Sequence, residues 1–287
     1  MKNKIFRRAG AIALTAVLGA GAAAMCAGCT TNRPEITITY NFNGKDYTVD
    51  YTLSRKTAPK TVQHFIELAD AGYYDGLCIH DYTAGHLMTG GYTYENDSLV
   101  EKNYYEAVAS LSLTQSVFRS DEEKTPLYSV YGEFEKNGVR LDSGSKFNHK
   151  EGALVMYYSD KGDDNTRVVT LRNDNGEYQE NSEYKYNSAT SLFYTYTGAA
   201  NAEKDENYCV FGMADDYENQ MNGENGLLTA IKSYTDSLAS GAVFAEEEEF
   251  TLNAFDPFES VRSAKIKTTF HVPTVPITVK SVKVNKY

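Results

Sequence analysis

Two runs of alternating apolar and polar residues, separated by Asn43-Gly44, constrain the fold more than any other feature of the sequence. Apolar side chains alternate with polar ones over residues 36–42 and again over residues 47–53. Alternation with a period of two is typical of a half-buried strand, and Asn-Gly tolerates the positive φ angles of a two-residue hairpin turn. The sequence therefore predicts a β-hairpin that turns one face toward a core.

Two other segments have helical periodicity. In the first, Thr57 is suited to cap the start of a helix, Pro59 falls in its first turn, and Gly72 is expected to end it. The second helix is expected over residues 226–238, with Gly241 ending it. Each helix has one apolar face, so both are expected to cover a core.

Seven further short apolar runs are bounded by turn residues and have the length of barrel strands. They are residues 77–82, 86–88, 153–158, 192–196, 208–213, 250–254 and 276–284. Many short strands with two isolated helices favour a mainly β fold, a closed barrel with helical caps, over a parallel α/β sheet. Three stretches, 93–126, 159–186 and 214–225, read as insertions, and the polar middle one is expected to be a long surface loop.

The first 28 residues have the features of a processed signal. Four basic residues precede an apolar run over 9–25 that is too short and too rich in Ala and Gly for a membrane span. The run ends in Cys26-Ala27-Gly28-Cys29, which resembles a bacterial lipoprotein signal, in which the final Cys is acylated. We expect a signal peptide over 1–28, lipidation at Cys29, a short tether over 29–34 and a single domain over 35–287; an ordinary secreted protein cleaved near the Ala cluster is the alternative.

Charge and cysteine content exclude several classes of function. The chain has 39 acidic and 28 basic residues, a net charge of -11, which argues against a nucleic-acid partner held by phosphate contacts. For the same reason, membrane attachment is expected to depend on acyl chains rather than on a basic surface. Cys78 and Cys209 lie in apolar segments, where a buried free thiol is expected rather than a disulfide. No zinc-type spacing and no glycine-rich phosphate loop is present, so no metal and no cofactor is expected.

A series of short motifs in fixed order resembles the cyclophilin family of peptidyl-prolyl isomerases. The series is APKTVQHF at 58–65, GYYDG at 72–76, IH at 79–80, GG at 90–91, GEF at 132–134, GALVM at 152–156, NSATSLFY at 187–194, VFG at 210–212 and PITVKSV at 276–282. The resemblance runs from residue 36 to residue 283, interrupted by the insertions. It implies a closed eight-stranded antiparallel β-barrel capped by two α-helices, with long loop insertions, which agrees with the pattern of strands and helices.

The resemblance also implies a chemistry. A prolyl bond isomerises over a barrier of about 18–20 kcal/mol, and a catalyst needs an apolar pocket and hydrogen-bond donors that favour the twisted amide. The family's main donor is an Arg that follows a Phe-His pair, and the register places Asp81 there. An ionised carboxylate only accepts hydrogen bonds. The implied function is a weak extracytoplasmic prolyl isomerase acting on proline-containing segments of secreted or surface proteins, or else a non-catalytic peptide-binding or scaffold lipoprotein.

The remaining site positions also follow from the resemblance. Thr89 and Tyr194 join Asp81 at positions that match the family's catalytic site, and Tyr194 is expected to form the floor of a proline pocket. The peptide-binding positions are His86, Leu87, Tyr157, Tyr158 and Tyr208. Four arginines in or beside the insertions are candidates for a replacement donor: Arg119, Arg140, Arg167 and Arg172.

Three further interpretations rest on the residues themselves. His80 lies in an apolar segment and is expected to be a core histidine with its hydrogen bonds satisfied. Asp81 and His86 are expected to meet as a charged pair across the pocket. Residues Glu246 to Glu249 are expected on a solvated turn or strand edge rather than in a calcium site, since calcium loops interleave carboxylates with Gly and carbonyl positions.

Overall fold

The computed structural model describes residues 31–119, 125–135, 147–158, 167–173, 175–184, 188–199, 208–255 and 263–287. The expected signal peptide and Cys29 lie outside the described residues. The described part of the expected tether is hydrogen-bonded to the domain: the Thr31 N–H donates to the Tyr287 carbonyl, and the Leu53 N–H donates to the Pro34 carbonyl, both at 2.8 Å. No helix in the described part of the chain is long and apolar enough to cross a membrane.

The predicted N-terminal hairpin is confirmed. It consists of β1 (Glu35–Phe42) and β2 (Lys45–Leu53), paired antiparallel without a register shift. Asn43 and Gly44 form the turn with φ angles of 49° and 77°. The alternate apolar residues from Ile36 to Phe42 are at most 2% exposed, so this face of the hairpin forms part of the core.

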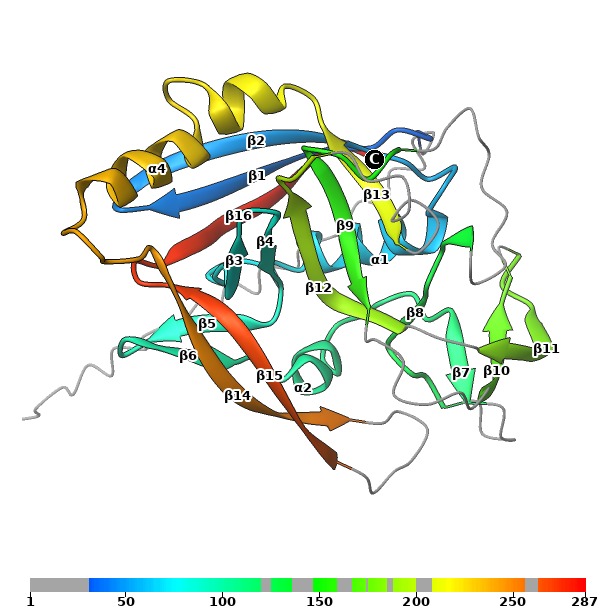
Figure 1. The fold of residues 1–287 in the computed structure, drawn as a ribbon. Helices are drawn as coiled ribbons and strands as arrows, with labels where there is room; N and C mark the ends of the chain where they lie inside the picture. Colours follow the sequence, from blue (N-terminus) through cyan, green and yellow to red (C-terminus); the bar gives the residue numbers. More distant parts are fainter. Residues whose placement is uncertain are drawn as a thin grey trace, which may run out of the picture. The chain divides into compact units, whose positions relative to one another are not determined.

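The hairpin belongs to an antiparallel sheet of nine strands in the described residues (Figure 1). Its main path runs β16-β1-β2-β13-β9-β12-β4-β3, and β8 pairs beside β12. The bounds are β3 (Asp81–Thr83), β4 (His86–Thr89), β8 (Val130–Tyr131), β9 (Ala153–Tyr158), β12 (Ser188–Tyr196), β13 (Cys209–Ala214) and β16 (Ile277–Lys286).

Backbone hydrogen bonds join the two ends of this path. The segment just before β3 pairs with β16: the Gly76 N–H donates to the Val279 carbonyl at 2.8 Å, and the Ile79 N–H donates to the Ile277 carbonyl at 2.8 Å. These bonds close the eight strands of the main path into a ring, because they pair its first strand with the residues that lead into its last. The predicted mainly β fold, an eight-stranded antiparallel barrel, is confirmed.

The barrel interior is largely aromatic. Phe65, Phe193 and Phe211 are completely buried, and the ring centroids of Phe193 and Phe211 lie 5.1 and 5.0 Å from that of Phe65. The hydroxyl groups of the buried Tyr40 and Tyr51 lie 3.4 and 3.0 Å from Thr195 Oγ, so these polar atoms have a partner inside the core. Burial raises the pKa of both phenols. The two predicted free thiols, of Cys78 and Cys209, are confirmed as buried and unpaired.

Helix α1 (Pro59–Asp70) has Pro59 in its first turn as predicted, but Thr57 is not its cap. The N-cap is Ala58, and the Thr57 hydroxyl donates to the Ser54 carbonyl instead. The first amides of the helix are satisfied from a distant segment, since the buried Glu133 carboxylate accepts the N–H of Lys60 at 3.1 Å and of Thr61 at 2.8 Å. Local sequence does not reveal a cap that is 72 residues away in the chain.

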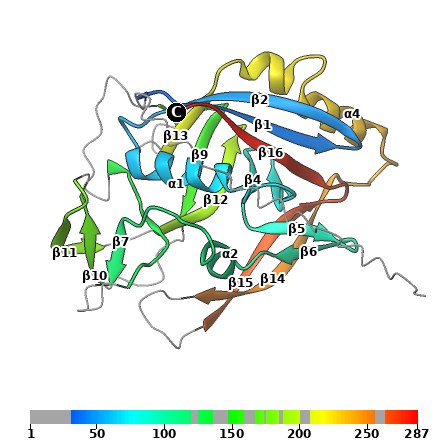
Figure 2. The same ribbon diagram turned by 180° about the vertical axis from the view of Figure 1, so that it is seen from behind.

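The predicted end of α1 is confirmed. Gly72 has a φ of 66°, and the N–H groups of Gly72 and Tyr73 bond to the carbonyls of Ala69 and Leu68, which is the pattern of a glycine-terminated helix. The second predicted helix is α4 (Leu227–Ser237), with Gly226 as its N-cap. A short π-helix, η2 (Glu218–Asn222), precedes it within the third insertion and lies beside it along β1 and β2 (Figure 2).

The insertions form secondary structure. The first contains the hairpin β5 (Tyr92–Glu95) and β6 (Ser98–Glu101), helix α2 (Tyr104–Val108) and strand β7 (Val117–Arg119). The prediction that residues 159–186 form a long surface loop is wrong for the described part. It contains the hairpin β10 (Arg167–Arg172) and β11 (Tyr178–Tyr184), which β7 completes as a three-stranded sheet. The pairing strand comes from another insertion, so local composition gave no sign of it.

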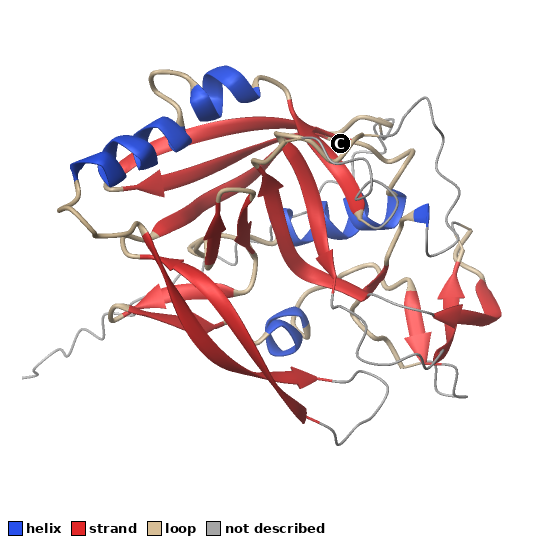
Figure 3. Ribbon diagram, viewed as in Figure 1, coloured by secondary structure: helices blue, strands red, loops and turns tan. Residues whose placement is uncertain are grey.

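A second long hairpin lies outside the barrel (Figure 3). It consists of β14 (Ala245–Phe255) and β15 (Ser263–Pro273), which pair with each other. Residues 250–254, predicted as a barrel strand, therefore belong to a separate two-stranded sheet. Residues Glu246 to Glu249 lie on this strand, as expected for a strand edge, and Glu249 pairs with Lys267 at 2.7 Å.

Candidate active site

One row of side chains crosses five strands on the face turned away from the barrel interior. Asp81 on β3 lies opposite Met88 on β4, Met88 opposite Tyr194 on β12, Tyr194 opposite Val155 on β9, and Val155 opposite Val210 on β13. Residues directly opposite one another in a sheet share a face. Met88, Ala153, Val155, Tyr194, Tyr196 and Val210 form a hydrophobic cluster distinct from the barrel core, here called the outer-face cluster.

Asp81 ends this row and is only 8% exposed. Its carboxylate accepts a hydrogen bond from His86 Nε2 at 2.7 Å and from the His271 backbone N–H at 2.8 Å, and His271 Nδ1 lies 3.3 Å away. Burial raises the pKa of Asp81, but the hydrogen bonds from His86 and His271 outweigh it, so the pKa of the carboxyl is lowered overall. The site therefore holds an ionised carboxylate at the position where the resemblance implies an arginine.

His86 is the predicted partner of Asp81, and the structure confirms the contact. Its side chain is 25% exposed, and the Thr83 hydroxyl lies 3.2 Å from Nδ1. The imidazole also lies beside Tyr194, with ring centroids 5.5 Å apart. His86 thus links the carboxylate to the aromatic part of the row.

His271 on β15 was not anticipated from the sequence. It holds Asp81 through its backbone and its ring, and its Nε2 lies 3.4 Å from a Glu247 carboxylate oxygen on the paired strand β14. The β14–β15 hairpin, drawn in orange in Figure 1, therefore runs over the end of β3 where Asp81 lies. A hairpin placed there limits how closely a bound peptide approaches the carboxylate.

A third histidine, His149, contacts the other part of the row. It is 1% exposed, and its Nε2 is hydrogen-bonded to the Tyr194 hydroxyl at 3.0 Å. Its ring centroid lies 4.1 Å from that of Tyr196 and 5.4 Å from that of Tyr208. Three tyrosines thus surround one imidazole, and one of them is Tyr194, the residue predicted to floor a proline pocket.

Leu87 and Thr89 point the other way. Leu87 is 1% exposed and belongs to the barrel core, and Thr89 is also 1% exposed, with its hydroxyl donating to the Cys78 carbonyl at 2.8 Å. Met88, which the sequence analysis did not single out, takes the outer-face position between them. In this structure Leu87 and Thr89 are therefore out of reach of a peptide that binds to the outer face.

The three tyrosines proposed for peptide binding differ in exposure. Tyr157 on β9 is 38% exposed, and Tyr208 is half-buried against His149. The side chain of Tyr158 lies outside the described part. The exposed Tyr157 and half-buried Tyr208 leave some aromatic surface near the row.

Of the four candidate replacement arginines, only Arg172 has a described side chain, and its described contacts do not include Asp81. Arg140 and the side chains of Arg119 and Arg167 lie outside the described residues. Arg172 on β10 is described, and its guanidinium lies over Phe118 and Tyr178 in the β7–β10–β11 sheet. That sheet and β3 lie apart in both ribbon views (Figures 1 and 2).

His80, next to Asp81, is buried as predicted but its hydrogen bonds are not satisfied. It is completely buried between Tyr92 and Phe270, and neither ring nitrogen has a hydrogen-bond partner among the described residues. Burial lowers its pKa to about 3, so the ring is neutral. The described residues also contain no cluster of three or more His, Cys, Asp or Glu able to hold a metal ion.

Signals for the missed residues were weak. Met88 could have been found from the alternation within β4, since Leu87 is apolar and two adjacent strand residues face opposite sides. His149 and His271 reach the row from a loop and from a separate hairpin, and no local pattern encodes either contact.

The chain matches one family model and is similar to several solved structures. The family model described as cyclophilin type peptidyl-prolyl cis-trans isomerase/CLD matches residues 37–219. No curated protein matches the chain. A solved cyclophilin type peptidyl-prolyl cis-trans isomerase from Cryptosporidium parvum is 12% identical, with 89% of this chain and 99% of that chain covered and a TM-score of 0.42. The Mimivirus cyclophilin is 10% identical, with 90% of this chain and 92% of that chain covered and a TM-score of 0.42.

Proposed function

Because the chain belongs to the cyclophilin type peptidyl-prolyl cis-trans isomerase family, we propose that it is a lipid-anchored, extracytoplasmic member that binds proline-containing peptide segments and isomerises them slowly. The observation that carries the proposal of slow turnover is the ionised Asp81 carboxylate at the position of the family's arginine. A carboxylate offers no hydrogen-bond donor to the twisted prolyl amide, and its charge repels the lone pair that develops on the prolyl nitrogen.

Binding is supported by the aromatic and apolar character of the outer-face cluster. Met88 and Tyr194 supply apolar and aromatic surface, and His86 and Tyr208 lie beside them. Proline rings bind well to such surfaces, because the ring is apolar and rigid and loses little entropy on binding. Turnover without the arginine then depends on burial of the substrate, because the described contacts already engage both ring nitrogens of His86.

A second candidate function, a non-catalytic peptide-binding or scaffold protein, is favoured by His149. Its Nε2 is hydrogen-bonded to the Tyr194 hydroxyl at 3.0 Å, and its ring meets that of Tyr194 edge-on with centroids 6.0 Å apart, so a buried imidazole lies beside the residue expected to floor the pocket. A substrate that packs on Tyr194 would therefore lie next to this imidazole. The two candidates therefore differ in whether bound peptide exchanges faster than free peptide.

Exchange NMR on a short Ala-Pro peptide with the full-length protein distinguishes the two. The wild type is expected to catalyse cis-trans exchange slowly. The exchange rate with Asp81→Asn should be at least as high as with the wild type, and the rate with Asp81→Arg should be higher. Asp46→Arg is the matched control, since Asp46 is exposed and paired with Lys280, and it should leave exchange unchanged. Shifted peptide resonances without exchange would establish the non-catalytic binder. The absence of any shift would refute both the isomerase and the peptide binder and would leave only a scaffold.

The proposed anchor has its own test. Metabolic labelling with a palmitate analogue should label the wild type and Cys26→Ala but not Cys29→Ala, because only the Cys that becomes the new N-terminus is acylated. The Cys29→Ala protein should also leave the detergent phase on phase separation, since the acyl chains supply the membrane affinity. Equal labelling of Cys29→Ala would contradict the lipoprotein assignment.

A further inference from the structure

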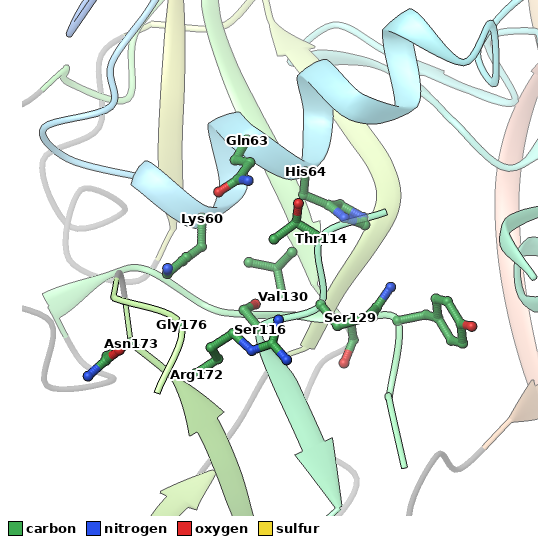
Figure 4. Close-up of a pocket in the computed structure, with 12 residues that line it drawn as sticks. Lys60, Gln63, His64, Thr114, Ser116, Ser129, Val130, Arg172, Asn173 and Gly176 are labelled. Atoms are coloured by element: carbon green, nitrogen blue, oxygen red, sulfur yellow. The ribbon is translucent and has the colours of Figure 1, made fainter. Parts of the chain in front are cut away.

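A cavity of about 360 Å³ lies between α1 and the inserted segments, apart from the candidate active site (Figure 4). Lys60 and Gln63 on α1 line one side of it, and Arg172 at the end of β10 lies on the other, with Ser129 between them. Small-molecule sites typically have volumes of about 300 to 1,000 Å³. The cavity is therefore large enough for a small ligand.

The charge of its lining differs from that of the whole chain. Lys60 and Arg172 carry permanent positive charges, and no Asp or Glu is among the lining residues, although acidic residues outnumber basic ones by 39 to 28 in the sequence. Two carboxylates lie nearby, but both are already engaged: Glu133 accepts from the first turn of α1, and Glu67 accepts from Gln63 and the Thr114 N–H. Arg172 makes no ion pair with a described carboxylate.

The Arg172 side chain is held in place without such a pair. Its Nη2 donates to the Tyr178 hydroxyl at 3.0 Å, and its Cζ lies 5.2 Å and 5.1 Å from the ring centroids of Phe118 and Tyr178. Its backbone N–H donates to the Ser116 carbonyl at 3.0 Å. Arginine is well suited to this arrangement, because the planar guanidinium contacts aromatic rings with its face and keeps N–H donors at its edge.

Two polar atoms at the cavity lack partners. Arg172 Nε and Ser129 Oγ are buried and have no hydrogen-bond partner among the described residues, and the whole Ser129 residue is only 5% exposed. A buried donor without an acceptor destabilises a fold, so such atoms in a native structure call for a ligand or water that accepts from them. A charged donor and a hydroxyl facing the same cavity favour an acceptor with negative charge.

We propose that this cavity binds a small anion through a carboxylate or phosphate group, with Arg172 Nε and Ser129 Oγ as donors and Lys60 adding positive charge. Guanidinium groups bind both kinds of oxyanion strongly, since charge-assisted hydrogen bonds are about twice as strong as neutral ones. The cavity is lined by α1 and the inserted segments and by none of the residues of the candidate active site. The proposed anion site therefore does not depend on the proposed prolyl isomerase function. Arg172 then has a role that differs from the replacement donor considered from the sequence.

NMR on the ¹⁵N-labelled full-length protein tests the proposal through the Arg172 Nε–H signal, identified by its loss in Arg172→Gln. Inorganic phosphate and succinate are titrated separately at constant ionic strength in chloride buffer. A saturable shift of this signal is expected with at least one of them. A shift with phosphate alone would assign a phosphate-bearing ligand, and a shift with succinate alone would assign a carboxylate.

The variants decide whether the anion binds in this cavity. Because these variants lack the Arg172 Nε–H signal, anion binding to them is followed through the backbone N–H signals of the cavity residues. Arg172→Gln and Arg172→Lys should each weaken binding about tenfold or more, because both lack the Nε donor, although Lys keeps the charge. Ser129→Ala should weaken binding less, and it decides the question if the Arg172 variants do not fold. Arg33→Gln is the matched control, an arginine that lies over the Phe147 ring at 4.6 Å, and it should bind as the wild type does. Absence of a shift with both anions, or unchanged affinity in the Arg172 and Ser129 variants, would overturn the proposal.

Discussion

Replacing Asp81 by Asn is expected to destabilise the protein by about 2 kcal/mol at neutral pH. The carboxylate accepts two short hydrogen bonds, from His86 Nε2 and the His271 N–H, and has a longer contact with His271 Nδ1. Hydrogen bonds to a charged group contribute about 1.5–3 kcal/mol each. Asn keeps an acceptor for one of them and avoids burying a charge, so the expected loss is about one such bond. The Asp81 side chain is only 11% exposed, so water replaces little of the lost hydrogen bonding.

The difference between wild type and Asp81→Asn should depend on pH in a defined way. The pKa of Asp81 is lowered from its usual 3.8 in the folded protein, so its stabilising effect is fully present above about that pH and is lost as the pH falls through the lower folded value. Urea unfolding of both proteins, at neutral pH and at a series of pH values below 3.8, measures the difference in their free energies of unfolding.

Asp46→Asn is the control for that experiment. The Asp46 carboxyl also has a lowered pKa, through its hydrogen bonds with Lys280 and Asn41, but it is exposed to solvent. Exposed ion pairs contribute little to stability, so its unfolding midpoint should stay near that of the wild type. Equal midpoints for wild type and Asp81→Asn at neutral pH, or a difference that persists unchanged in acid, would refute the reasoning.

Three other substitutions test the surrounding structure. His149→Ala should increase affinity for an Ala-Pro peptide several-fold in an NMR titration, because it uncovers Tyr194; lower affinity would show that the imidazole is part of the binding surface. Gly90→Ala should cost more than about 3 kcal/mol in urea unfolding, since φ is 107° and a Cβ would lie 2.1 Å from a carbonyl oxygen of β12, whereas Gly44→Ala, with open space around it, should cost only about 1 kcal/mol. Thr195→Val should cost about 1–3 kcal/mol, because two buried phenol hydroxyls lose their shared partner, and an unchanged midpoint would mean that these hydroxyls satisfy each other.

Elements whose information is local were predicted well. The Asn43-Gly44 turn, the strands beside it and the end of α1 at Gly72 follow from φ preferences and from the two periodicities, which act within a few residues. Free Cys78 and Cys209 followed from their apolar neighbours. The contact of Asp81 with His86 was also foreseeable, because the two positions lie five residues apart on adjoining strands.

Elements that depend on distant partners were not predicted. The β7–β10–β11 sheet is assembled from two insertions, and the cap of α1 comes from Glu133, so neither has a signal within its own segment.

The sequence alone determined the barrel, the family and the carboxylate at position 81, because motif order, alternation and turn chemistry are properties of the chain itself. Only the tertiary structure decided what surrounds that carboxylate. His149 and His271 reach the site from segments 68 and 190 residues beyond Asp81, and the cavity at Arg172 forms where two insertions meet α1. Contacts across such separations are set by packing and by the need of buried polar groups for partners, and these act only once the chain has folded.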